Sequence, residues 1–144
     1  MGIIGRAIVR MFGGKPISEN ENQDLFSIRR NTLISAINLL RRNEPVEKEA
    51  KASISFIVHR YVATKMKISH INEAREPARA FSTCKELKIL LDKQELLWKE
   101  ALENSKNKRF PEAIRNLRDA DNLLQLEKAS EDSLNVFWEL EKAA

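Results

Sequence analysis

The sequence predicts an all-α fold: an antiparallel four-helix bundle of long helices, preceded by a short amphipathic N-terminal helix. Three observations support this prediction. Charged residues make up 32% of the 144 residues, whereas Gly and Pro number only four each, a composition that favours long charged helices. Apolar residues recur every three or four positions along most of the chain, as on one face of an α-helix. Gly and Pro interrupt these rows at a few points, which marks the expected helix ends.

The central element is a predicted helical hairpin that turns within residues 104–111. The apolar rows on its two sides are Phe81, Cys84, Leu87, Leu91, Trp98 and Ala101 before the turn, and Ala113, Leu117, Ala120 and Leu124 after it. Pro111 suits a first helical position, where its missing N–H removes no hydrogen bond. Asn104 to Lys108 supply a polar turn, and we expect Phe110 to be buried between the two helices.

Capping residues and prolines predict the boundaries of the helices before the hairpin. Ser18 is a candidate N-cap with Glu21 three residues later, so a helix should start near Ser18. Glu44 and Pro45 should end it. The next helix is expected to bury a wide stripe made of Val46, Ala50, Ile54, Ile57, Val58, Tyr61, Val62 and Met66. The helix after that should begin near Pro77, because proline in a helix interior costs about 3 kcal/mol.

The last helical pattern runs from Pro111 toward Ala143, but its apolar row turns polar at Glu127 and Glu131. Residues 127–133 therefore either break the helix or mark where it leaves the bundle. Acidic residues in general are expected on solvated outward faces. Beyond the polar segment, Phe137 and Trp138 belong to a C-terminal apolar cluster, which is either a lid on the core or a contact surface for another chain.

The first twelve residues form a short cationic amphipathic pattern. Its apolar side consists of Ile3, Ile4, Ile8, Met11 and Phe12. Its opposite, basic side consists of Arg6 and Arg10. Gly13 and Gly14 follow as a hinge, so we expect an N-terminal arm at residues 1–14 and a single helical-bundle domain at residues 15–144. Twelve residues form only a marginal helix in water. The arm therefore needs a partner, which is its own bundle, another subunit or protein, or a membrane surface.

Two stretches resemble known families. The arm resembles the short amphipathic leader of membrane-remodelling proteins of the phage-shock and ESCRT-III type, over these dozen residues alone. The run from Lys108 to Ala120, preceded by Trp98 and Ala101, resembles the helix pair of a tetratricopeptide repeat or a MIT-type three-helix module, over about 34 residues. The second resemblance implies a groove that receives a peptide or a partner helix.

Charge is unevenly distributed along the chain. Residues 1–71 hold twelve Lys or Arg against six Asp or Glu, a net charge of +6, whereas the remaining residues carry −2. The second predicted helix contributes a candidate anion-binding group, Arg29, Arg30, Arg41 and Arg42. The basic half thus suggests a nucleic-acid-coating or filament-forming structural protein as the alternative function.

Residue types needed for catalysis or for metal binding do not come together in this sequence. His59 and His70 are the two histidines, and no Glu-x-x-His pair exists, so neither a metal site nor a catalytic site is expected. The single Cys84 lies on an apolar row and is expected to be a core residue. No cofactor or small-molecule substrate is inferred. With no signal peptide and no apolar run of about 18 residues, a cytoplasmic location is expected.

These patterns together favour a non-enzymatic helical assembly or adaptor protein. It would dock through its amphipathic N-terminal helix on a partner subunit, another protein or a membrane surface. Self-association or a protein partner is the leading expectation.

Overall fold

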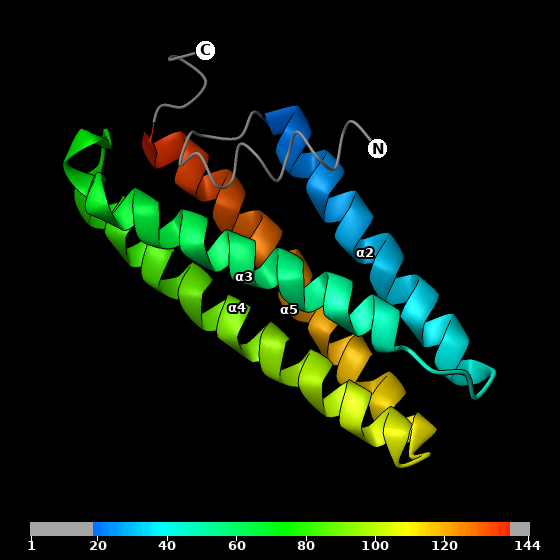
Figure 1. Ribbon diagram of the computed structural model, residues 1–144. Helices are drawn as coiled ribbons and strands as arrows, with labels where there is room; N and C mark the ends of the chain where they lie inside the picture. The colour runs from blue at the N-terminus through cyan, green and yellow to red at the C-terminus, as the bar shows by residue number, and fades with distance from the viewer. Residues whose placement is uncertain (1–18, 139–144) are drawn as a thin grey trace.

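The computed structural model describes the backbone of residues 19–138 and the side chains of residues 24–138 (Figure 1). The helices are α2 (Glu19–Arg41), α3 (Glu47–Ser69), the short 3₁₀ helix η1 (Ile71–Glu73), α4 (Pro77–Lys106) and α5 (Phe110–Trp138). No strand occurs among these residues, so the predicted all-α class is confirmed. The N-terminal arm, with its hinge, and residues 139–144 lie outside the described part.

The four long helices lie alongside one another (Figure 1). α4 packs against α5 and α3, and α2 packs against α5 and α3. The start of α4 lies beside the end of α5, where the Glu76 N–H donates to the Phe137 carbonyl at 3.2 Å. At the opposite end of the pair, the Asn104 side chain donates to the Asn116 side chain at 2.8 Å. The hairpin helices are thus in contact along their length.

Buried positions on the hairpin helices recur in alternating steps of four and three residues. They are Ala80, Cys84, Leu87, Leu91, Gln94, Trp98, Ala101 and Ser105 on α4, and Ala113, Leu117, Ala120, Leu124, Glu127, Glu131 and Leu134 on α5. The same steps run along α3 from Val46 to Thr64. These steps average about 3.5 residues, the repeat of helices that coil around each other. Apolar and polar side chains both occupy these rows.

Two predicted helix boundaries are confirmed, because α2 ends at Arg41, before Glu44 and Pro45, and α4 begins at Pro77. The predicted start of α2 at Ser18 lies outside the described residues. The turn between α4 and α5 is shorter than expected, because α4 continues to Lys106 and α5 already begins at Phe110. Lys108 in this turn adopts a left-handed conformation with φ of 59°, an uncommon conformation for a residue with a Cβ. It allows the chain to reverse within three residues.

Several predictions about the core are wrong. Val58, Val62 and Phe81 were expected on buried stripes but are 43%, 38% and 43% exposed. The buried row of α3 includes Ser53 and Arg60 instead, so Val58 and Val62 lie on the side of the helix that faces solvent. The acidic residues Glu127 and Glu131 neither break α5 nor lie on an outward face. α5 is continuous through residues 127–133, and both carboxylates are buried.

Candidate functional site

The predicted docking residues of the N-terminal arm lie outside the described residues. The contacts expected for Ile3, Ile4, Ile8, Met11, Phe12, Arg6 and Arg10 therefore stay predictions. Candidate sites on the described bundle are its buried ion pairs, the C-terminal aromatic cluster, a pocket between two connections, and an exposed face shared by α3 and α4.

Arg29 does not lie on the surface with the other candidate anion-binding arginines, which corrects its place in that group. Its side chain is 5% exposed and binds the Glu127 carboxylate with both terminal nitrogens, at 2.6 and 2.8 Å. One of these nitrogens also donates to Gln94 at 3.2 Å, and Gln94 in turn donates to Glu127 at 2.7 Å. A charge-assisted bidentate pair of this kind satisfies the guanidinium inside the bundle.

The other three arginines of the predicted group are exposed. Arg30 lies 3.4 Å from Asp121 of α5, and Arg42 lies 3.5 Å from Glu44. Arg41 donates a long hydrogen bond of 3.5 Å to its neighbour Asn38. Arg30 and Arg42 thus already have carboxylates beside them. The structure does not bring the four arginines together on one surface, because Arg29 points inward.

A second ion-pair layer lies one helical turn further along α5, at Glu131. Arg60 of α3 donates to the Glu131 carboxylate, and Lys67 approaches the other carboxylate oxygen at 3.9 Å. Burial alone would raise the pKa of Glu131, but the positive charges of Arg60 and Lys67 outweigh it and hold that pKa below its usual value. Burial also lowers the pKa of Lys67, against the attraction of Glu131. This layer joins α3 to α5.

The C-terminal aromatic residues pack on the end of the bundle. Phe137 and Trp138 are half-buried against a cluster that contains Cys84, Leu87 and Leu134. The Arg79 guanidinium lies over the Phe137 ring at 5.9 Å from its centroid. This placement fits the expected lid on the core. Whether the same side chains also contact another chain stays a prediction.

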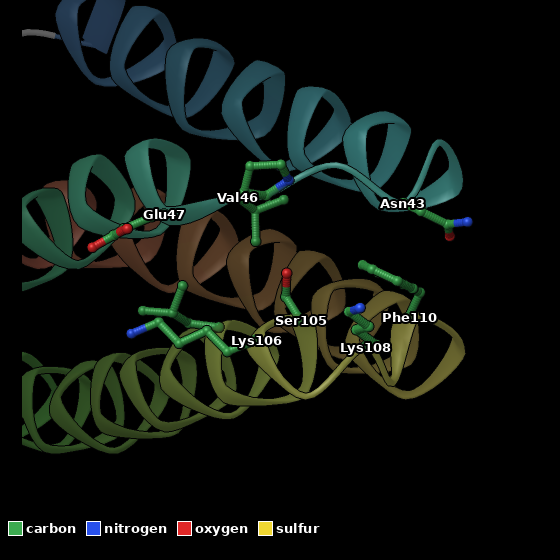
Figure 2. Close-up of a pocket in the computed structure, with 9 residues that line it drawn as sticks. Asn43, Val46, Glu47, Ser105, Lys106, Lys108 and Phe110 are labelled. Carbon is green, nitrogen blue, oxygen red and sulfur yellow. The ribbon is translucent and has the colours of Figure 1, made fainter.

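A small pocket lies where the α2–α3 connection meets the α4–α5 turn. It has a volume of about 220 Å³, and Figure 2 shows Val46 and Ser105 pointing toward each other across it. Phe110 lines the same pocket and is half-buried, so it is less enclosed than the sequence predicted. Lys106 and Lys108 also belong to its lining.

An exposed face combines aromatic rings with lysines at the seam between α3 and α4. We call it the lysine–aromatic face and define it as the exposed residues Val62, Lys65, Phe81 and Lys85 together with the half-buried Tyr61 and Lys88. The ammonium groups of Lys65 and Lys88 lie 5.0 and 5.6 Å from the centroid of the Tyr61 ring. That of Lys85 lies 5.4 Å from the Phe81 centroid. Sequence reasoning missed this face because it placed Val62 and Phe81 in the core.

Side chains that could bind a metal ion or take part in catalysis are either far apart or buried. Among residues 24–138, no three His, Cys, Asp or Glu side chains are grouped in a way that could hold a metal ion. Burial raises the pKa of the Cys84 thiol to about 11, which favours the unreactive protonated form. Burial also lowers the pKa of the half-buried His59. None of the described helices combines the length and the apolar character needed to cross a membrane.

Comparison with known proteins finds no matching protein family, no matching curated protein and no matching solved structure.

Proposed function

We propose that this protein is a non-enzymatic helical assembly or adaptor protein that docks through its N-terminal amphipathic arm on a partner subunit, another protein or a membrane surface. The proposal includes an antiparallel four-helix bundle as the body that carries the arm. Contacts between the start of α4 and the end of α5, and between Asn104 and Asn116, support that arrangement of the hairpin.

The observation that supports this function most is the core formed by the bundle itself. One cluster of buried side chains draws on all four long helices, including Leu33 of α2, Ile57 of α3, Trp98 of α4 and Leu117 of α5. Burying apolar area in this way is the main favourable term in folding. Because this cluster is built from the four long helices, the proposal assigns the apolar residues of the arm to association and not to the core. The hinge that the sequence predicts at Gly13 and Gly14 would, in this proposal, connect the arm to the bundle.

The nucleic-acid-coating alternative receives less support. It is based on the net charge of +6 over residues 1–71, with four arginines of the second helix as the candidate anion-binding group. Of these four, Arg29 is buried on Glu127, and Arg30 and Arg42 lie beside carboxylates. Each local carboxylate lowers the gain from neutralising a phosphate. We therefore retain association through the arm as the proposed function.

Deleting residues 1–12 tests the proposal. The truncated chain should keep its helical circular dichroism and its cooperative unfolding, while losing self-association in light scattering or binding to vesicles. Ile8→Asp should act like the deletion, because docking would then require a carboxylate to be desolvated. Ser27→Asp, a matched charge at an exposed position of α2, should change neither property. Unfolding of the truncated chain, or unchanged association, would contradict the proposal.

A further inference from the structure

The lysine–aromatic face has exposed apolar side chains on both of its helices. Val62 on α3 and Phe81 on α4 are 38% and 43% exposed, and Val58 continues the apolar row one turn along α3. Lys88 of α4 lies over Tyr61 of α3, which ties the two halves of the face together. Exposed apolar side chains on two packed helices make this face a candidate contact surface for a partner.

Among residues 24–138, the lysines of this face have no carboxylate partner. Elsewhere on the bundle, Lys51, Lys99 and Lys128 each pair with an acidic residue one turn away on their own helix. In the described part of the chain, no such pair forms at Lys65, Lys85 or Lys88. Residues 50–72, which make up most of α3, contain no Asp or Glu. The face therefore carries three positive charges, from Lys65, Lys85 and Lys88, beside its apolar and aromatic side chains.

Its chemistry narrows the class of partner. A second copy of the same face would bring lysines against lysines, which opposes association. Single-stranded nucleic acid stacks its bases on free aromatic faces, but ammonium groups already lie over the Tyr61 and Phe81 rings. A bilayer surface is entered by long side chains such as Leu, Phe and Trp, whereas Val58 and Val62 are short and the Phe81 ring has the Lys85 ammonium group over it.

A third helix fits these features best. Two helices packed side by side present rows of side chains between which a further helix can lie. From Val58 to Lys65 the α3 row extends by about 10 Å, or two helical turns. An amphipathic helix presents anchors at i, i+3, i+4 and i+7 over the same length. Acidic residues beside those anchors would meet the three lysines.

We propose that the lysine–aromatic face binds an acidic amphipathic helix of a partner protein, with apolar anchors on Val62 and its neighbour Val58 and carboxylates on Lys65, Lys85 and Lys88. This site deepens the proposed assembly role by naming the chemistry of a partner. It uses no residue of the N-terminal arm. The arm and the face can therefore fail or succeed separately.

The test uses the full chain and a labelled synthetic peptide of about 14 residues, with Leu at i, i+3, i+4 and i+7 and Glu at the flanking positions. Fluorescence anisotropy should show the peptide binding at least about tenfold more tightly than a scrambled peptide of the same composition. Lys65→Glu together with Lys85→Glu should weaken binding by about tenfold or more, because attraction becomes repulsion. A peptide with Lys in place of Glu should prefer that reversed variant.

The control reverses one exposed lysine on each of the same helices, Lys48→Glu with Lys93→Glu, away from the face. It should leave affinity within about twofold. Circular dichroism checks that both double variants fold. Ile8→Asp should retain peptide binding, so failure of the arm is distinguishable from failure of the face.

Several outcomes would overturn the proposal. The acidic peptide does not bind, the scrambled peptide binds equally well, or the affinity stays the same when Lys65 and Lys85 are changed to Glu. Tighter binding of a single-stranded oligonucleotide or of an anionic phosphatidylglycerol vesicle, lost in the same reversed variant, would assign the face to that partner instead.

Discussion

Arg29 and Glu127 are 98 positions apart in the chain, yet they form a two-pronged ion pair inside the bundle at 2.6 and 2.8 Å. Gln94 hydrogen-bonds to both, so the pair ties α2, α4 and α5 together. A buried ion pair is weak evidence for net stability, because desolvation offsets its attraction. Its geometry nonetheless disfavours sliding of one helix along another, because a shift of one helical turn would leave a buried charge without its partner. We infer that the pair fixes the register of these helices.

Glu127→Ala should destabilise the protein by about 3–5 kcal/mol, because it leaves the Arg29 guanidinium buried without a counter-charge. Urea denaturation followed by circular dichroism measures the change. Replacing both partners, Arg29→Met with Glu127→Leu, should cost less than the single change. Glu112→Ala on the exposed side of the same helix is the control, with an expected effect within about 0.5 kcal/mol. A single variant that is as stable as the control would contradict the register role.

Stability should fall in acid because of Glu131. Its pKa in the folded protein lies below the ordinary value of 4.5, through the charges of Arg60 and Lys67, which overcome the effect of burial. A lowered folded pKa contributes stability that is present above the unfolded pKa and is lost as the pH falls through the folded pKa. The loss attributable to Glu131 should therefore begin near pH 4.5 and grow below it.

Glu131→Gln should unfold more easily at pH 7 and should show a flatter dependence of its melting temperature on pH below 4.5. Asp132→Asn, a neighbouring exposed acid, provides the matched control. Thermal melts of both variants from pH 7 to pH 3 measure the difference. An unchanged acid slope in Glu131→Gln would show that this carboxylate is not held ionised by its partners.

Periodicity predicted the helices well, and the reason why it misplaced parts of the core is physical. The buried rows keep steps of four and three through polar positions, so Glu131 occupies the same row as Leu124 and Leu134. A prediction that uses apolar residues alone skips such polar positions, and the side of the helix that it predicts to be buried is then wrong. On α3 it selected Val58 and Val62 in place of Ser53 and Arg60.

The unbroken step pattern of α5, 113-117-120-124-127-131-134, was the available signal for the buried acids. Their partners could not be predicted in the same way. Which helix supplies Arg29 or Arg60 depends on how the helices are placed around one another, and a single periodicity does not contain that information. The lysine–aromatic face depends on the same placement, because Lys88 and Tyr61 belong to different helices.

Trp98 and Phe110 should differ in their contributions to stability, although both are aromatic residues of the central hairpin. Trp98 is 2% exposed, whereas Phe110 is half-buried at the pocket shown in Figure 2. We expect Trp98→Ala to cost about 3–5 kcal/mol, because it leaves a large cavity, and Phe110→Ala to cost about 1–2 kcal/mol. Chemical denaturation of the two variants measures both. An equal loss would indicate that Phe110 is as enclosed as Trp98.

Cys84 should report on the C-terminal lid. Its thiol is buried with Leu87 and Leu134 beneath Phe137 and Trp138, and burial raises its pKa to about 11. Because the thiolate is the reactive form, alkylation by iodoacetamide at pH 8 should be slow in the folded protein and fast in urea.

Phe137→Ala with Trp138→Ala should speed this alkylation by about tenfold or more, since opening at that end of the bundle would cost about 1.4 kcal/mol less. Phe81→Ala is the matched control, because Phe81 lies one turn from Cys84 on the same helix but faces solvent. Equal alkylation rates in the wild type and the double variant would show that the two aromatic residues do not cover the core, and would leave contact with another chain as their role.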